Sequence, residues 1–574
     1  MNTGFAMKES SGSSESSGSS APSRFSKTNV QVQGIDEPDI IKTDGENIYA
    51  VSNGKVYVLK SFPVSDSKII SKIESDHFFP LNIFNYKDLI VVIGMKEQPK
   101  EERKKINEKI AYNYYDYNWE NHLQIRIYNV SDKENPKIEQ VIQIPKSHYI
   151  DARLYDDEIV VVSKKYLHFR STHEDEDEDI FHKNNFPEHQ FSEIGKEDID
   201  EKNPENFQLQ CQDIGALSKT DNRFMITLTK IKLGNQSILK KSFPLETFSF
   251  LAGENQIFSS SEYMYLTSSN SRYKVEDDQY IDYSIVHQID LKNLRYNGFL
   301  SVPGYIHDQF SMDEYQNTFR IATTARTFRT FPYHSSSAVH IFDTKTLELQ
   351  GKITNLAPNE TIYSARFMKE KLFLVTFQKV DPLFVIDLHD PKNPTVLGKL
   401  KIPGYSDYLH PINEDGSKLL GIGKDTFSPE NSDTAFYLGV KLSYFDCSNF
   451  TDPKEMFNIV IGSRGTDTPI SRNDHKAFLF DPENSLVILP ISLYETGEKY
   501  QRSFPSYNDF VGNFLYVLKI DEPNEFTIKG RISHENEQIL RALYIDDFLI
   551  SFSGTKLKIH SIEDIKFIKE IILD

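Results

Sequence analysis

The amino-acid sequence predicts an all-β protein, and two observations lead to that class. Short apolar runs rich in aromatic and β-branched residues alternate with turns that contain Pro, Asp and Asn, which is the pattern of strands. Residues 364–404 hold four such runs in succession. The unit recurs along the chain, and four antiparallel strands in about 40 residues form one blade of a propeller. The expected fold is a β-propeller of eight or nine four-stranded antiparallel blades in one ring.

The repeat is visible in both halves of the unit. The turn from Asp387 to Pro394 recurs with the same spacing from Asp446 to Pro453. The first strand pair recurs at three other places, as NIFNYKDLIVVIG from Asn82, DARLYDDEIVVVS from Asp151 and RALYIDDFLISFS from Arg541. A fixed internal repeat is stronger evidence for an architecture than local propensity.

Nine candidate modules can be counted. They start near Asp39, Asn82, Asp151, Gln256, Asp308, Ser364, Asp407, Asp474 and Arg541. Propellers typically have four to eight blades, so a nine-blade ring and an eight-blade ring with one misassigned module both stay open. The third module is the weakest, because its second strand pair (residues 224–243) lies far from its first. Gly45, Gly304 and Gly404 are predicted in inter-strand or inter-blade turns, where φ is positive or space is tight.

The chain divides into a tail, one propeller and two insertions. Residues 1–27 form a Ser/Gly-rich tail with the composition of a flexible tether, and residues 28–574 form the propeller. One insertion lies near 97–120 and ends in the Tyr-rich stretch 112–119. The other, at 171–206, contains six consecutive acids at 174–179, with His173, His182 and His189 nearby. We expect this second insertion to be a solvated loop that folding does not need.

Charge and cysteine usage exclude several classes. The net charge of −19 argues against binding to nucleic acid or to an anionic membrane surface, and it favours cations or basic partners. The two cysteines, Cys211 and Cys447, make neither a disulfide framework nor a zinc motif. No apolar run is long enough to span a membrane, and the N-terminus lacks the apolar core of a signal peptide.

Long motifs resemble a known family. They are TNVQVQGIDEPDIIKTDG at 28–45, DQFSMDEY at 308–315, SARFM at 364–368, VDPLFVIDL at 380–388, KIPGYSDYLHP at 401–411 and DHKAFLFDPE at 474–483. Together they resemble the secreted or cell-surface β-propeller domain family of bacteria and archaea, which is distantly related to WD-repeat propellers. The resemblance covers about residues 25–570 and implies a propeller that is exported. It transfers no catalytic residue, because the family carries no assigned activity.

The first candidate site is the mouth of the central channel, where the loops that lead into the inner strands converge. The residues predicted there are Asp36, Glu37, Asp39, His307, Asp308, Arg366, Asp407, His410, Asp474 and His475. Arg153 and Arg541 are expected at the same inner-strand position as Arg366. Acids, His and Arg on one axis could bind a cation, a peptide or a sugar. The structural alternative, in which these groups tie neighbouring blades together by ion pairs, carries more weight.

Two weaker candidates lie in the insertions. Carboxylates and His in 171–206 could bind Ca²⁺, but the consecutive acids lack the alternation of a calcium loop, so no cofactor is expected. Residues 112–119 could contact a protein or a sugar ring, or could pack on the rim of the ring.

The leading hypothesis is a non-catalytic binding or scaffold protein, extracytoplasmic or at the cell surface. Its partner would be a protein or a glycan, and we expect the chain to be a monomer. The sequence has no nucleophile elbow, no zinc protease motif and no phosphate-binding loop. The alternative is a hydrolase or lyase acting on a polysaccharide or a peptide, because propeller active sites are assembled from distant loops. Convergence of Asp308, Arg366, His410 and His475 on an open cleft would favour that alternative.

Overall fold

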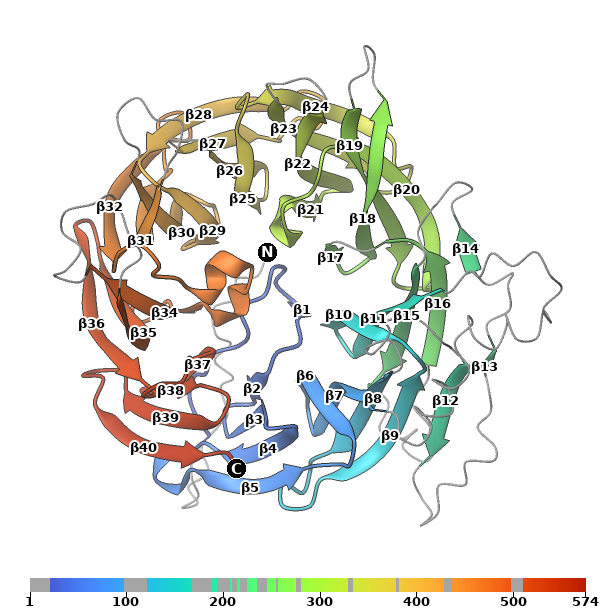
Figure 1. The fold of residues 1–574 in the computed structure, drawn as a ribbon, viewed down its shortest axis with the longest axis vertical. Helices are drawn as coiled ribbons and strands as arrows, with labels where there is room; N and C mark the ends of the chain where they lie inside the picture. The colour runs from blue at the N-terminus through green and yellow to red at the C-terminus, as the bar shows by residue number, and fades with distance from the viewer. Residues whose placement is uncertain are drawn as a thin grey trace, which may run out of the picture.

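Nine blades surround a central axis in the computed structural model (Figure 1). The structure describes residues 21–97, 121–167, 188–193, 207–208, 214–216, 224–234, 245–253, 256–274, 280–328, 334–377, 381–427, 436–496 and 509–574. The predicted all-β propeller is confirmed, and of the two blade counts left open the structure has nine.

Blades 1 to 3 come first in the chain, each from its inner to its outer strand. Blade 1 consists of β2 (Ile41–Thr43), β3 (Asn47–Ser52), β4 (Lys55–Lys60) and β5 (Lys68–Ile73). Blade 2 consists of β6 (Phe78–Tyr86), β7 (Leu89–Lys96), β8 (His122–Asn129) and β9 (Lys137–Ile144). Blade 3 consists of β10 (His148–Tyr155), β11 (Glu158–Tyr166), β15 (Phe224–Lys232) and β16 (Leu245–Leu251).

Blades 4 to 6 follow, and two pairs between β19 and β22 join blades 4 and 5. Blade 4 consists of β17 (Ile257–Ser259), β18 (Tyr263–Lys274), β19 (Tyr280–Asp290) and β20 (Arg295–Pro303). Blade 5 consists of β21 (Met312–Tyr315), β22 (Thr318–Phe328), β23 (Ser335–Asp343) and β24 (Leu349–Leu356). Blade 6 consists of β25 (Thr361–Met368), β26 (Lys371–Phe377), β27 (Asp381–Asp387) and β28 (Thr395–Ile402).

Blades 7 to 9 complete the ring. Blade 7 consists of β29 (Tyr405–Pro411), β30 (Lys418–Phe427), β31 (Phe436–Asp446) and β32 (Lys454–Ile461). Blade 8 consists of β33 (Leu479–Asp481), β34 (Leu486–Glu495), β35 (Asp509–Asp521) and β36 (Glu525–Ser533). Blade 9 consists of β37 (Arg541–Ile545), β38 (Phe548–Phe552), β39 (Lys556–Ser561) and β40 (Phe567–Ile572). Among the residues that the structure describes, the 3₁₀ helices are η1 (Val64–Asp66), η4 (Gln309–Ser311), η5 (Pro469–Arg472) and η6 (His475–Ala477).

A repeated Asp fixes the turn between the third and fourth strands. Asp290, Asp343, Asp387 and Asp446 each accept, through Oδ1, a hydrogen bond from a backbone N–H two or three residues later. Asn129 does the same in blade 2. Asp and Asn favour such turns because the side chain replaces a backbone acceptor. The Asp-to-Pro spacing that repeats in the sequence is therefore turn chemistry.

Blade 3 is split, as the sequence predicts. Its second strand ends at Tyr166 and its third begins at Phe224. Parts of the intervening segment extend two sheets: β12 (Glu188–Glu193) pairs with β9, β13 (Phe207–Gln208) with β12, and β14 (Ile214–Ala216) with β16. The acidic run at 174–179 lies outside the described residues.

The core is divided among the interfaces between neighbouring blades. Between blades 6 and 7, Phe373 and Leu383 pack with Leu409, Leu419 and Phe445. One apolar cluster of this kind lies at each of the other interfaces. A single blade would expose both of these faces, so the blades are stable only when stacked on their neighbours.

Blade 9 meets blade 1 without exchanging a strand. The interface is closed by an apolar cluster that includes Tyr57 and Phe552. The Asn53 side chain donates a hydrogen bond to the Leu573 carbonyl at 2.9 Å. Each blade is thus built from strands of its own stretch of chain.

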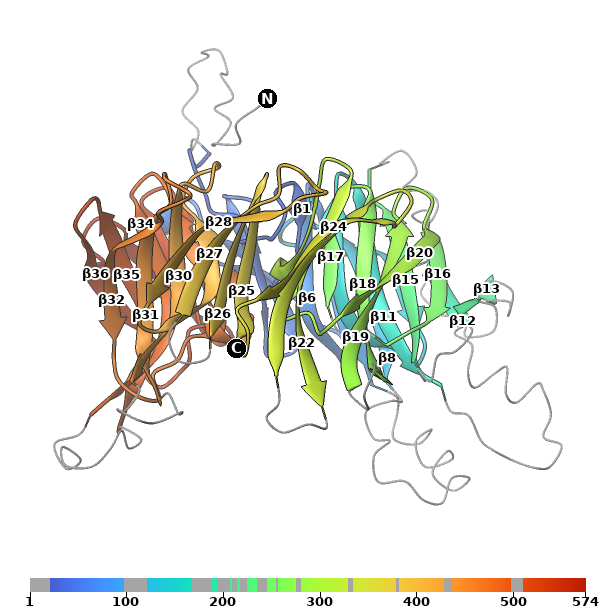
Figure 2. The ribbon, with the colours of Figure 1, turned by 90° about the horizontal axis from the view of Figure 1, so that it is seen from above.

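A segment that precedes blade 1, residues 23–40, crosses the ring, and we call it the strap (Figures 1 and 2). Phe25 bridges Ile545 in blade 9. Further on, β1 (Ile35–Asp36) pairs with the end of β10 in blade 3. Asp39 then exchanges two backbone hydrogen bonds with Ile83 in blade 2. The strap therefore lies over the ring face where the inner strands end.

Candidate functional site

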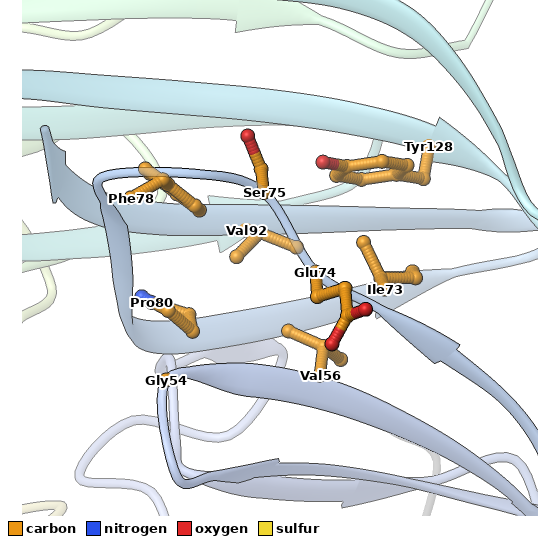
Figure 3. A pocket seen from close by; sticks show the side chains of 9 residues that line it. All are labelled: Gly54, Val56, Ile73, Glu74, Ser75, Phe78, Pro80, Val92 and Tyr128. Carbon is orange, nitrogen blue, oxygen red and sulfur yellow. The ribbon is translucent and has the colours of Figure 1, made fainter.

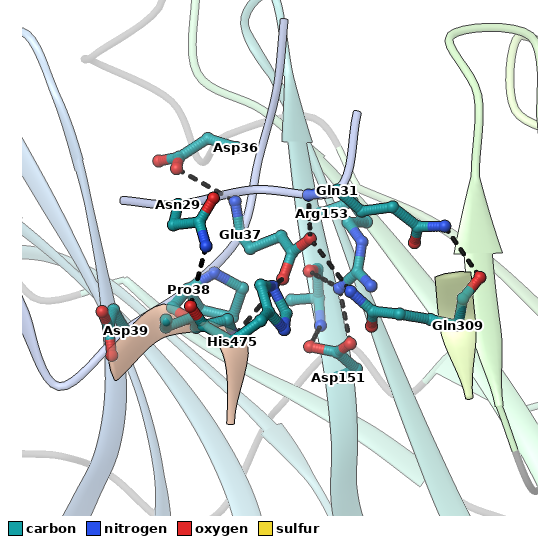
Figure 4. A network of polar contacts seen from close by, with 12 residues as sticks. Asn29, Gln31, Asp36, Glu37, Pro38, Asp39, Asp151, Arg153, Gln309 and His475 are labelled. Atoms are coloured by element: carbon teal, nitrogen blue, oxygen red, sulfur yellow. Dashed lines mark hydrogen bonds and ion pairs between the residues drawn. The ribbon is translucent and has the colours of Figure 1, made fainter. Parts of the chain in front are cut away.

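The strap carries the most connected of the predicted site residues, Glu37. Its side chain is 2% exposed and accepts hydrogen bonds from His475 Nε2 at 3.0 Å and from the Gln31 backbone N–H at 3.0 Å (Figure 4). Lys476 Nζ lies 3.6 Å from the same carboxylate. Burial would raise the pKa of Glu37, but the nearby Arg153 and His475 hold it well below its usual range. Glu37 therefore acts as a charged tie between the strap and η6.

Asp39 and Asp474 both form ion pairs with the guanidinium group of Arg541. Arg541 Nε lies 2.9 Å from Asp39 Oδ1, and Arg541 Nη1 lies 2.8 Å from Asp474 Oδ2. These contacts join the strap, blade 9 and the segment that leads into blade 8. Asp36 is paired as well, because Lys42 Nζ donates to its Oδ1 at 2.7 Å. Asp39 and Asp474 thus tie separate parts of the ring together, whereas the Asp36 pair is local to the start of blade 1.

The three inner-strand arginines do not share one position. Arg153 and Arg366 each stand two residues before the end of their strands, β10 and β25. Arg541 stands at the start of β37, four residues before its end. The prediction is right for Arg153 and Arg366 and wrong for Arg541, because the aligned runs begin at different points of the strand.

Asp308 has a local structural role. It is 5% exposed, precedes η4, and its Oδ1 accepts hydrogen bonds from the backbone N–H and the hydroxyl of Ser311 at 3.0 and 2.9 Å. Burial raises its pKa. This is the pattern of a helix N-cap.

His410 packs among aromatic rings. Its Nδ1 lies 3.2 Å from the Tyr408 hydroxyl, and its ring centroid lies 4.6 Å from that of Phe478. Burial, with a smaller contribution from Arg366, lowers the pKa of His410 to about 3. A neutral imidazole is the form expected at physiological pH.

Three predicted residues have no such polar tie within the described part of the chain. Arg366 stacks its guanidinium 5.1 Å from the Phe310 ring centroid, and its buried Nη1 has no hydrogen-bond partner there. Asp407 Oδ2 is buried without a partner of hydrogen-bond geometry in the same residues; burial raises its pKa to about 7, although the nearby Ser471 hydroxyl lowers it. His307 is half-buried and stacks on Tyr363 with centroids 6.3 Å apart.

The structure thus separates the ten predicted residues into two groups. Six are engaged in ties or capping: Asp36, Glu37, Asp39, Asp308, Asp474 and His475. Arg366, Asp407 and His307 remain available for polar contacts, and His410 is packed beside them. Of the four residues named for the enzyme alternative, Asp308 and His475 are 5% and 6% exposed and His410 is packed among aromatic rings, so the four do not converge on an open cleft.

Two side chains of the strap that bond residues at the channel were not predicted from the sequence. Asn29 Nδ2 donates to the Tyr408 hydroxyl at 3.0 Å and to the His475 carbonyl at 2.8 Å. Gln31 Nε2 donates to the Gln309 carbonyl at 2.7 Å (Figure 4). Both amides lie in the motif 28–45, which was their only signal. Their partners are hundreds of positions away, so no local pattern reports them.

A hollow between blades 1 and 2 lies away from these residues (Figure 3). Val56, Phe78, Val92 and Tyr128 line it, with Glu74 at its edge. Its volume is about 10 Å³, near the space needed by one water molecule. It is too small for an organic ligand.

Other predicted features fall partly outside the described residues. The Tyr-rich stretch 112–119, the acidic run and Cys211 all lie outside them. Cys447 is a buried free thiol whose pKa burial raises to about 12. Among the described residues, no three His, Cys, Asp or Glu side chains gather as a metal site. In the same part of the chain, no helix has the length and apolarity to cross a membrane.

Comparisons with known proteins agree with this architecture. A family model described as beta propeller domain matches residues 25–565. An uncharacterised protein of Methanocaldococcus jannaschii is 30% identical over 598 residues, which cover 96% of this chain and 84% of the relative. An uncharacterised protein of Archaeoglobus fulgidus is 26% identical over 605 residues, covering 94% and 83%. A solved eukaryotic initiation factor covers 87% of this chain and 98% of its own at 9% identity, and its TM-score of 0.36 carries no functional information.

Proposed function

The chain belongs to the beta propeller domain family, and from that premise we propose that it is a non-catalytic binding or scaffold protein. Its ligand surface is the channel mouth at blades 5 to 7. One observation carries the proposal: Arg366 Nη1 and Asp407 Oδ2 are buried without a hydrogen-bond partner among the described residues, and the half-buried His307 stacks beside them, whereas the other acids of the channel are engaged. Buried polar groups are normally hydrogen-bonded, so unused ones indicate a place for a ligand or for water.

The same geometry does not favour the hydrolase or lyase alternative. A general acid or base must reach the proton that it transfers. Asp308 is bonded to Ser311, and His475 is bonded to Glu37. Arg366 supplies a charge for binding, and Asp407 is a single carboxyl whose buried Oδ2 bonds to no second acid or base among the described residues.

We place the protein outside the cytoplasm or at the cell surface, as a monomer with a protein or glycan partner. Support for this location comes from the resemblance to the secreted family and from the Ser/Gly-rich tail. Protease treatment of intact cells is the direct test, and protection of the chain would contradict a surface location. Light scattering on the purified chain should give the mass of one copy.

The binding proposal is tested on peptide and glycan arrays with the full chain. We expect Arg366→Ala and His307→Ala to abolish the signals that the natural chain gives. Arg295→Ala and His389→Ala are matched controls, because both residues are exposed on the outside of the ring. Signals that survive Arg366→Ala and His307→Ala unchanged would place the binding surface elsewhere.

A further inference from the structure

We propose that Asn449 is the attachment site of an N-linked glycan. Asn449, Phe450 and Thr451 form the acceptor triplet Asn-x-Ser/Thr, in which x is any residue except Pro. Such a triplet indicates a surface loop of an exported protein. The inference goes beyond the binding function, and it rests on the proposed location outside the cytoplasm. Because the triplet is short, the argument depends on where the fold places it.

The triplet lies in the turn between β31 and β32 of blade 7, and β32 forms the outer edge of that blade (Figure 1). In an antiparallel blade the third strand runs in the direction of the first, so this turn lies on the ring face that the strap crosses. Ser448, Asn449 and Thr451 are exposed. The Phe450 ring between them packs 6.4 Å from that of Phe373, centroid to centroid. The turn is thus anchored on the blade while Asn449 is open to solvent.

The two side chains that define the triplet contact each other. Asn449 Oδ1 accepts a hydrogen bond from the Thr451 hydroxyl at 2.8 Å and one from the Thr451 backbone N–H at 3.2 Å. Asn449 Nδ2 donates no hydrogen bond to any residue that the structure describes. The nitrogen that would carry the sugar is therefore available.

The turn itself does not need an amide at this position. Asp132 in blade 2 and Asp390 in blade 6 stand at the same distance before the proline of their turns. Each accepts a hydrogen bond from the backbone N–H two residues later, at Glu134 and Lys392. A carboxylate closes the same turn, so turn formation does not account for the amide nitrogen of Asn449.

The triplet at Asn129 is less accessible. Ser131 donates to Asn129 Oδ1 through its N–H and its hydroxyl, as Thr451 does to Asn449. However, Asn129 is half-buried and is the last residue of β8, where it pairs with Leu89 and Lys137. An acceptor must leave such pairs before it can enter the transferring enzyme, and opening a strand costs more than moving an exposed turn.

The triplet at Asn359 has a different geometry. Asn359 Oδ1 lies 3.0 Å from His334 Nδ1, and Thr361 is the first residue of β25. A further triplet, at 235–237, lies outside the described residues. In the turn of blade 6 the corresponding run Asn393-Pro394-Thr395 has Pro at x, which excludes it. Asn449 is therefore the best acceptor in the described part of the chain.

The reaction needs a donor and an enzyme from the cell. The donor is an oligosaccharide joined through its anomeric carbon to a polyisoprenyl phosphate or diphosphate. Asn449 Nδ2 forms a bond to that carbon, while the bond from the carbon to the phosphate oxygen breaks and the phosphate keeps the electron pair. One of the two Nδ2 protons passes to a base of the transferring enzyme.

The test is mass spectrometry of proteolytic peptides from the full chain purified from its native host cells. We expect the peptide that contains Asn449 to carry the added mass of a glycan, and the peptide that contains Asn359 to have its unmodified mass. Occupancy at Asn129 should be lower than at Asn449. Near-ultraviolet circular dichroism checks that each variant below is folded.

Asn449→Asp is the sharpest variant, because it keeps a turn acceptor like Asp390 and lacks the amide nitrogen. It should lose the added mass and stay folded. Thr451→Ala should also lose the added mass, whereas Thr451→Ser, which keeps the hydroxyl, should retain it. Asn359→Gln is the matched control and should leave the modification of Asn449 unchanged.

An unmodified Asn449 peptide in the native chain would overturn the inference. Added mass that persists on this peptide in Asn449→Asp, or added mass at Asn359 in place of Asn449, would overturn it as well. The proposed location is judged separately: if protease on intact cells digests the chain and Asn449 is unmodified, only the glycan site is wrong. The binding function is judged by the dependence of the array signals on Arg366 and His307, whatever the state of Asn449.

Discussion

The Glu37 carboxylate accepts a hydrogen bond from His475 Nε2 at 3.0 Å, although 438 positions separate the two residues in the chain. Both are nearly excluded from solvent. Breaking a buried pair by removing one partner typically costs about 3–5 kcal/mol. We expect Glu37→Gln to lower the free energy of unfolding by about 3 kcal/mol, measured by urea denaturation. Glu483→Gln, at a side chain 73% exposed, should change it by less than about 0.5 kcal/mol. If the two substitutions changed the free energy of unfolding equally, the Glu37–His475 pair would not stabilise the fold.

Ring closure makes a second prediction. Deletion of residues 541–574 removes blade 9 and with it Arg541, which holds Asp39 and Asp474. The apolar faces of blades 8 and 1 would then be exposed to water. We expect the truncated chain to lose cooperative thermal unfolding, because those faces have no other partner. A truncated chain with the melting temperature of the full chain would show that the ring need not close.

Gly404 tests the turn chemistry. The φ angles of Gly45, Gly304 and Gly404 are +95°, +95° and +83°, so the predicted positive values are confirmed. A Cβ at Gly404 would also lie 2.5 Å from the Lys424 carbonyl oxygen. We expect Gly404→Val to cost about 1–3 kcal/mol. Gly34→Ala is the control for the strain of a positive φ without a close contact. The φ of Gly34 is +88°, but its Cβ would meet no atom within 4 Å. A neutral Gly404→Val would mean that the turn can rearrange.

As pH falls, we expect the ring to lose stability at a higher pH than protonation of its carboxylates alone would cause. Burial lowers the pKa of His287, His340, His534 and His560 to about 4. A pKa depressed in the folded state gives stability that is complete above the unfolded value of about 6.5 and lost as pH falls through 4. Asp407, with its raised pKa, acts in the opposite direction as pH falls below 7.

We therefore expect the melting temperature to fall between pH 6.5 and 4.5, with the buried histidines, His410 included, outweighing the raised carboxyls of Asp407 and Asp308. His340→Gln should flatten this dependence, while His389→Gln, at a side chain 72% exposed, should leave it unchanged. A melting temperature that stays constant over this interval would show that the pKa of these histidines is not depressed in the folded state.

The repeat in the sequence predicted the blades well because the contacts that shape each blade join residues close together in the chain. Asp387 and Asp446 fix their turns within three residues, and such spacing is visible in a single sequence. The channel is different, because Asn29, Gln31 and Glu37 find partners in blades that lie far along the chain. The sequence indicates which residues gather at the axis, but pairing depends on the ring diameter and on strand ends, which no local pattern encodes. The misplaced Arg541 shows the same limit.

The strap also restricts how this architecture can change in evolution. The four strands of every blade come from that blade's own stretch of chain, so duplication or loss of one blade would require little other rearrangement. Residues 23–40, however, must reach from Ile545 across the axis to Leu154 and Tyr155 and then to Ile83. Adding or removing a blade changes the diameter that this segment has to cross. A viable change in blade number would therefore require a compensating insertion or deletion in the strap, because the length of the strap must match the diameter of the ring.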